Sequence, residues 1–67
     1  MLAKLKGKIS EKGFNQKTMS EAIGMTEQTF SRKITGKTEF TWGEIQRIAM
    51  ALEIYDEPEE MKRIFFT

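Results

Sequence analysis

The sequence predicts an all-α domain of five short helices over residues 1–67. Apolar residues recur at three- and four-residue intervals in several separate stretches, which is the period of a helix with one buried face. Residues that commonly cap helices precede these stretches, and glycine or proline separates them. No stretch has the alternation of apolar and polar residues that is typical of a β-strand. The length suits one domain with a single small core.

The first helix is expected over about the first twelve residues. Leu2, Leu5 and Ile9 share one face at helical spacing, and the lysines of this segment fall mostly elsewhere. Gly13 then marks the end of the helix, because a glycine just past the last apolar position is a common stop signal.

Two short helices are expected next, on either side of one glycine. Asn15 suits the cap of a helix over residues 16–23, since its side chain can accept from the unpaired N–H groups of the first turn. Thr26 can cap a helix over residues 27–34 in the same way. Gly24 can adopt the left-handed conformation that turns the chain sharply at a helix end. The two helices are therefore predicted to be joined by a tight turn.

The helical period separates the inward and outward faces of this pair. Met19 and Ile23 share one side of the first helix, and Phe30 and Ile34 share one side of the second. Ser20 is small, as a residue must be where two helices cross at short distance. The outward side of the second helix carries side chains of the kinds that read base edges. They are Glu27, Gln28, Thr29, Ser31 and Arg32.

The segment over residues 15–34 resembles the helix-turn-helix of the phage Cro and repressor group, within the wider XRE-type family of bacterial regulators. The family pattern has a glutamine that opens the first helix, then a small residue, a glycine and an apolar residue at fixed positions. The corresponding residues are Gln16, Ser20, Gly24 and Phe30. Lys33 departs from the pattern, because the family usually has an apolar residue there. The resemblance extends over about residues 5–54 and implies a lambda-repressor-like fold.

The same resemblance implies a sequence-specific transcriptional regulator, similar to a phage Cro or a short phage-type repressor, that binds a two-fold operator as a dimer. The helix over residues 27–34 would be the recognition helix. Base readout is then expected from Glu27, Gln28, Thr29 and Arg32. Phosphate contacts are expected from Gln16, Lys17, Ser31, Lys33 and Lys37. The expected partner is double-stranded DNA, with no cofactor, no membrane and no small-molecule substrate.

Two further helices are expected after this pair. Thr41 and Glu44 have the spacing of a capping box, which predicts a helix that continues to about Leu52. Trp42 falls on its apolar face and is expected in the core, together with Ile45, Ile48, Ala49 and Leu52. Pro58 and the acidic residues around it predict the start of a last short helix.

The end of the chain carries more apolar side chains than a five-helix core obviously needs. They are Met61, Ile64, Phe65 and Phe66. The first three share one side of the last helix, and the fourth points away from that stripe. One recognition helix reads only a few base pairs, so two copies are needed to single out a site. Residues 57–67 are therefore predicted to hold a homodimer interface.

Charge is unevenly distributed, although the net charge is only +1. Residues 1–38 include 8 basic and 3 acidic side chains, a net charge of +5, and residues 39–67 include 3 basic and 7 acidic ones, a net charge of −4. A lysine-rich solvated surface could give the same counts. The basic part contains the helix pair, however, which favours a domain with one face toward phosphates.

Composition excludes several other classes of function. The chain has no cysteine and no histidine, which excludes disulfides, zinc-finger ligands and histidine-based acid/base chemistry. No nucleophile and base stand in a recognisable setting, so no enzyme is expected. The acidic run around Pro58 lacks the alternating, glycine-containing loop of an EF-hand, so no metal site is expected. No apolar run approaches about 20 residues and the start lacks a signal-peptide core, so a cytoplasmic protein is expected.

An alternative function is a protein-interaction module, such as an anti-repressor or an antitoxin-like partner. Such a protein would keep this fold but bind another protein through its C-terminal half. The acidic and apolar composition of residues 39–67, which end in Phe65 and Phe66, supports this alternative. A test of binding to DNA distinguishes the two.

Overall fold

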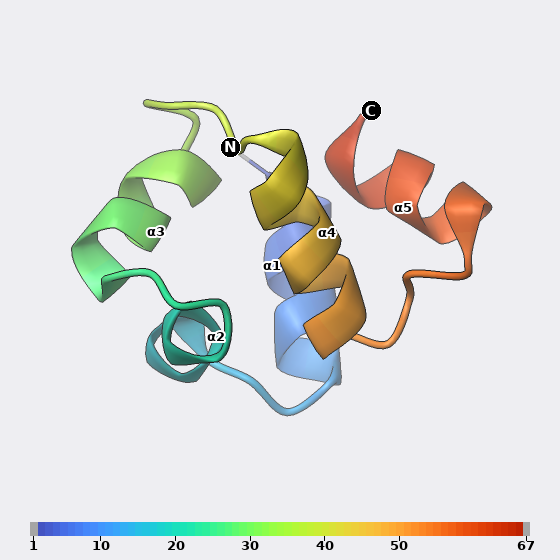
Figure 1. Ribbon diagram of the computed structural model, residues 1–67, viewed down its shortest axis with the longest axis horizontal. Helices are drawn as coiled ribbons and strands as arrows, with labels where there is room; N and C mark the ends of the chain where they lie inside the picture. Colours follow the sequence, from blue (N-terminus) through green and yellow to red (C-terminus); the bar gives the residue numbers. More distant parts are fainter. Residues whose placement is uncertain (1, 67) are drawn as a thin grey trace.

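The computed structural model describes residues 2–66 and has the five helices that the sequence predicts. They are α1 (Ala3–Glu11), α2 (Gln16–Ala22), α3 (Glu27–Ile34), α4 (Trp42–Ala51) and α5 (Pro58–Phe65). Figure 1 shows α3 at one side of the molecule and α5 at the other, with α1 behind α4 between them. No strand occurs among the described residues, so the prediction of an all-α fold is confirmed. Nor does any helix in residues 2–66 have the length and apolar character needed to cross a membrane.

One core joins the helices, and it contains the inward faces predicted for the first three. α2 packs against α3 and α4, and α1 packs against α5. Phe30 is fully buried, and the centroid of its ring lies 5.8 Å from that of Phe40. The backbone N–H of Leu2 donates to the carbonyl of Ile34 at 3.0 Å, which ties the start of the chain to the end of α3. The other fully buried large side chains among the described residues are Leu5, Met19, Ile34, Ile48, Leu52, Ile54 and Ile64.

Side-chain caps fix the starts of α2 and α3. Asn15 Oδ1 accepts from the backbone N–H of Thr18 at 2.8 Å, and the Thr18 hydroxyl accepts from the N–H of Asn15 at 2.9 Å. This reciprocal pair satisfies two N–H groups that have no partner inside the helix. Thr26 Oγ1 accepts from the N–H of Thr29 at 3.2 Å. Both predicted caps, Asn15 and Thr26, are confirmed. The bond that the Thr18 hydroxyl accepts was not predicted from the sequence.

The first four helices end in the same geometry, in which the residue after the C-cap has a positive φ. At the end of α2, Gly24 has a φ of +74° and its N–H donates to the carbonyl of Glu21. The next N–H, that of Met25, reaches back to Ser20 at 2.9 Å. These two bonds satisfy carbonyls that the helix leaves free. The corresponding positions in the other helices are Gly13, Gly36 and Glu53.

The variant Gly24→Val is expected to lower the free energy of unfolding by about 1 to 2 kcal/mol, because a β-branched residue must adopt a left-handed conformation. No atom outside the neighbouring residues lies within 4 Å of the place that a Cβ would take, so the loss is conformational. Thermal unfolding followed by circular dichroism measures it. Asparagine tolerates this conformation, so Gly24→Asn should lose less. Equal midpoints for both variants and the unchanged protein would contradict the assigned turn.

Trp42 lies outside the core, so the prediction that placed it there is wrong. Its side chain is 58% exposed, whereas Ile45, Ile48 and Ala49 on the same helix are buried. The reason is its place at the first residue of α4. Side chains on a helix lean toward its N-terminus, so the indole extends beyond the start of α4 toward solvent. Periodicity assigns a residue to a face, but it does not say whether a neighbour covers the helix end.

The apolar stripe of α5 packs on its own domain, which removes Ile64 from the side chains predicted to form a dimer interface. Ile64 is 1% exposed and belongs to the core, and Met61 and Phe65 pack against that core. The Phe65 ring meets the ring of Phe40 edge-on, with 6.4 Å between centroids. Phe66 is 60% exposed. Ile64 is therefore not available to a second copy, because α5 uses its stripe to attach to α1.

Candidate functional site

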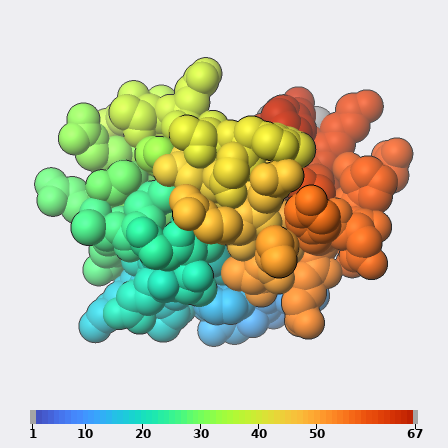
Figure 2. Space-filling view, viewed as in Figure 1, coloured from blue at the N-terminus to red at the C-terminus, as the bar shows by residue number. Residues whose placement is uncertain are grey.

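The outward face of α3 presents the four side chains that were predicted to read base edges. All four are exposed: Glu27, Gln28, Thr29 and Arg32. Phe30 and Ile34 hold the opposite face of the helix in the core. Figure 2 shows side chains of this green segment projecting from one edge of the molecule, while the gold residues of α4 cover the middle of the face. The helix thus forms a polar edge on a rigid apolar support.

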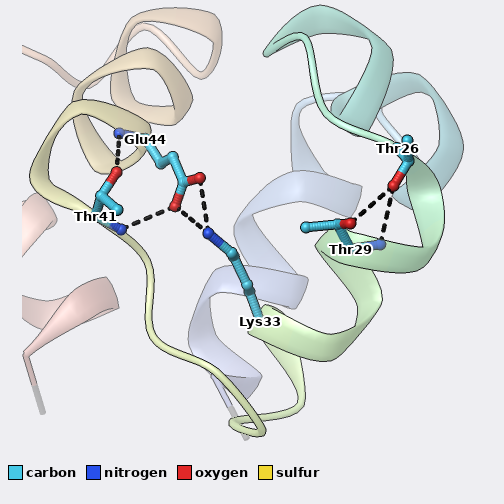
Figure 3. Close-up of polar contacts among 5 residues, drawn as sticks. All are labelled: Thr26, Thr29, Lys33, Thr41 and Glu44. Atoms are coloured by element: carbon cyan, nitrogen blue, oxygen red, sulfur yellow. Dashed lines mark hydrogen bonds and ion pairs between the residues drawn. The ribbon is translucent and has the colours of Figure 1, made fainter.

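Two threonines order the first turn of α3 (Figure 3). Thr26 Oγ1 accepts from the backbone N–H of Thr29 and donates to the Thr29 hydroxyl oxygen at 2.9 Å. Glu27 opens the helix, where a carboxylate also stabilises the positive end of the helix dipole. The Thr26 cap and the Glu27 carboxylate therefore both stabilise the start of α3.

The candidate phosphate contacts lie on the elements that adjoin α3. Gln16 is partly buried and Lys17 is exposed at the start of α2, which packs against α3. Lys37 is exposed in the following loop, and its backbone N–H donates to the carbonyl of Arg32 at 2.9 Å. Ser31 is partly buried, so it offers less to a ligand than its neighbours do. In the sequence, Lys17 therefore precedes α3 and Lys37 follows it.

Lys33 is placed differently from the other predicted phosphate contacts. Its Nζ lies 2.6 and 2.7 Å from the two carboxylate oxygens of Glu44, and both side chains are 14% exposed (Figure 3). Glu44 Oε1 also accepts from the backbone N–H of Thr41 at 2.8 Å, and its own N–H donates to Thr41 Oγ1 at 3.2 Å, as the predicted capping box requires. Lys33 therefore points toward α4. A lysine at an inward position can stay charged there because a carboxylate neutralises it.

The carboxyl group of Glu44 is held in its charged form. Burial favours the neutral form, but hydrogen bonds from Lys33 and from the Thr41 backbone, with the attraction of the ammonium, lower the pKa of Glu44 below its ordinary value. The ion pair therefore persists at neutral pH. The sequence predicted only one of the two roles of Glu44. The capping box with Thr41 follows from local spacing, whereas the ion pair with Lys33 joins two helices.

A groove of about 420 Å³ lies beside the end of α3 and the end of α5. Its apolar wall includes Leu2, Phe40, Ile45, Phe65 and Phe66. Phe66 is exposed at its edge, so an apolar hollow and an apolar projection lie next to each other. No group of three or more metal-binding side chains occurs within the described residues 2–66.

Comparison with known families identifies one match. A model described as the Cro/C1-type HTH DNA-binding domain matches residues 4–60. The matched range includes α2, α3, the loop after α3 and α4, which together build the polar edge described above. No curated protein and no solved structure matches the chain significantly.

Proposed function

Because the chain belongs to the family of Cro/C1-type helix-turn-helix DNA-binding domains, we propose that it is a sequence-specific transcriptional regulator that inserts α3 into the major groove of an operator. The exposed polar face of α3 carries this proposal, since Phe30 and Ile34 anchor the other face in the core. A helix supported in this way can offer side chains to base edges without losing its own packing. The protein would act in the bacterial cytoplasm, on a phage or prophage operator.

The side chains of α3 suit particular bases. Arg32 can donate two hydrogen bonds to O6 and N7 of guanine, and Gln28 can pair with N6 and N7 of adenine. The Thr29 methyl group can contact the methyl of thymine, and Glu27 can accept from N4 of cytosine. Gln16, Lys17, Ser31 and Lys37 would contact phosphates and set the docking angle. Lys33 is omitted from that set, because its ammonium is paired with the carboxylate of Glu44.

In vitro selection of bound duplexes from a random library tests this function. We expect enrichment of a two-fold symmetric sequence whose half-sites are separated by about one helical turn, or roughly 34 Å. Such a sequence would show both base readout and paired binding. A library that remains random after several rounds would overturn the proposal.

Arg32→Ala should weaken binding to the selected operator by about tenfold, or roughly 1.4 kcal/mol, and relax the preference at one base pair in each half-site. Lys37→Ala should instead weaken all duplexes alike, since a phosphate contact carries no sequence information. Binding curves on the operator and on single-base variants measure both effects. Uniform weakening by Arg32→Ala would show that Arg32 is not a base reader.

We further propose that two copies meet through Phe66 and the groove beside it. An isologous contact uses the same patch twice, so each Phe66 can enter the groove of the other copy. One aromatic ring per copy buries little area, which predicts a weak dimer that DNA tightens by linkage.

Phe66→Asp is therefore expected to abolish cooperative occupation of two half-sites while leaving the domain folded. Sedimentation and gel shifts on one and two half-sites measure this loss. The matched control is Tyr55→Asp, which changes another half-exposed aromatic residue outside the groove. Dimerisation that survives Phe66→Asp would place the interface elsewhere, on α4 or α1.

A protein-interaction module remains the second candidate, and one observation favours it. Among residues 2–66, the large apolar side chains with high exposure all lie in the acidic part of the chain after residue 38: Trp42, Met50, Tyr55 and Phe66. Exposed apolar residues in such numbers can mark a protein-binding surface. The selection experiment separates the two functions, because a module of this class would enrich no DNA sequence.

A further inference from the structure

We infer that the Lys33–Glu44 ion pair positions the last turn of α3 for base reading, so that Lys33 and Glu44 are positioning residues for Arg32 and Lys33 makes no phosphate contact. This inference rests on the proposed DNA-binding function and specifies which interaction orients the recognition helix. Four steps lead to it.

The first step is the uneven support of α3. The backbone of α3 approaches that of α2 more closely than that of α4. Its chain leaves through the loop of residues 35–41, which contains no regular structure beyond the helix-ending turn. The bond from Lys33 to Glu44 crosses from the last turn of α3 to the first turn of α4 (Figure 3). It therefore adds a polar bond between two helices whose apolar side chains share one core.

The second step is the rigidity of the acceptor. Glu44 is the third residue of α4 and belongs to the capping box with Thr41, so one carboxylate serves the helix start and the ammonium together. A carboxylate at this place is also favoured by the helix dipole. The anchor is thus fixed by the backbone of α4. Both charges are largely withdrawn from solvent, which reduces the screening of their attraction.

The third step connects the pair to the base-reading residue. Arg32 directly precedes Lys33, and its carbonyl accepts from the N–H groups of Lys37 at 2.9 Å and of Thr38 at 3.4 Å. The last turn and the start of the loop therefore move together. A bidentate contact between Arg32 and guanine needs both hydrogen bonds at good distance and angle. A small shift of this turn would weaken that contact.

The fourth step concerns phosphate. The ammonium of Lys33 gives two of its three N–H groups to Glu44 and is largely withdrawn from solvent, so it would have to turn away from that carboxylate to reach a phosphate on the outer face of α3. Removing one partner from a shielded pair is costly, because the remaining charge is poorly solvated. The exchange would gain little over the existing pair. Lys33 therefore stays with Glu44 when DNA binds.

The experiment compares five variants of the full chain on the selected operator and on an unrelated duplex over a series of salt concentrations: Glu44→Gln, Lys33→Met, their double variant, Lys33→Arg and Lys37→Met. Glu44→Gln removes the charge but keeps an amide oxygen that can accept from Thr41, so the capping box is retained. Lys33→Met replaces the charge by an apolar side chain of similar length at a position that faces inward. Lys37→Met is the matched control for the loss of an exposed lysine. Circular dichroism at the assay temperature verifies that each variant is folded.

We expect Glu44→Gln and Lys33→Met each to weaken binding to the operator by about fivefold to tenfold. Affinity of Glu44→Gln for the unrelated duplex should be equal or higher, because a negative charge is lost. The plot of log affinity against log salt should keep its slope in Lys33→Met, whereas Lys37→Met should flatten it by about 0.9 for each lost contact. The double variant should lose no more than either single one, and Lys33→Arg should retain operator preference.

Three results would overturn the inference. A flattened slope in Lys33→Met would make Lys33 a phosphate contact, and unchanged operator preference in Glu44→Gln would remove its positioning role. Additive losses in the double variant would show that the two residues act separately. If the unchanged protein itself prefers no sequence, the proposed function has failed instead. If Lys33→Met does not fold, the salt slope and operator preference of Lys33→Arg and Glu44→Gln decide the question.

Discussion

Phe30→Ala is expected to be about 3 to 5 kcal/mol less stable than the unchanged protein. Phe30 is fully buried, and its ring packs with that of Phe40 on the inward side of α3. Truncation removes apolar contact and leaves a cavity that the surrounding helices can fill only in part. Domains are stable by roughly 0.05 to 0.15 kcal/mol per residue, so this loss is comparable to the whole stability of so short a chain. The variant should therefore unfold at a much lower urea concentration than the unchanged protein.

Urea unfolding followed by circular dichroism measures this loss, with Phe66→Ala as the matched control. The control removes the same ring from a position that is 60% exposed, and its effect should lie within about 0.5 kcal/mol. A Phe30→Ala variant as stable as the control would mean that α3 does not rest on this ring.

Ser20→Leu should be about 3 kcal/mol less stable, at the upper end of the range for overpacking. Ser20 is 1% exposed in α2, the helix that packs against both α3 and α4. Leucine places three carbon atoms, in a branched group, where serine has one oxygen atom, at a position that is already buried. The helices must then separate or the side chain must adopt a strained rotamer.

Thermal unfolding of Ser20→Leu beside Ser20→Ala identifies the cause. The hydroxyl of Ser20 donates to the carbonyl of Lys17 at 2.7 Å, within its own helix. Alanine loses this local bond but has the higher helix propensity, so its effect should lie within about 0.5 kcal/mol. Equal losses in the two variants would trace the effect to the hydroxyl and not to the volume of the side chain.

The parts of the fold that sequence predicted are those governed by rules over a few residues. Asn15 and Thr26 cap helices because a side-chain oxygen reaches an N–H three positions later. Gly24 turns the chain because a glycine has no Cβ and therefore adopts a positive φ without a steric cost. Glu53 shows the limit of this rule, since it adopts a φ of 62° at the end of α4 without being glycine. There the burial of Ile54 beside it outweighs the local preference.

The features that sequence did not predict depend on how helices meet. The periodicity of α5 was consistent with either a dimer interface or a core contact, and only the packing of α5 on α1 assigns Ile64 to the core. Lys33 and Glu44 lie 11 residues apart on different helices, so no local pattern joins them. For the candidate site, the period identified the exposed face of α3, but whether Lys33 belonged to it depended on a partner across the loop.

The exposure of Trp42 determines what tryptophan fluorescence can report about this protein. It is the single tryptophan of the chain, and its indole extends into solvent at the start of α4. An indole in water emits at similar wavelengths whether the chain is folded or not, so tryptophan fluorescence should report unfolding poorly. A molecule that covers the start of α4 would shift the emission to the blue and shield the ring from a soluble quencher. The fluorescence of Trp42 therefore provides a signal, without an added label, for binding at the start of α4.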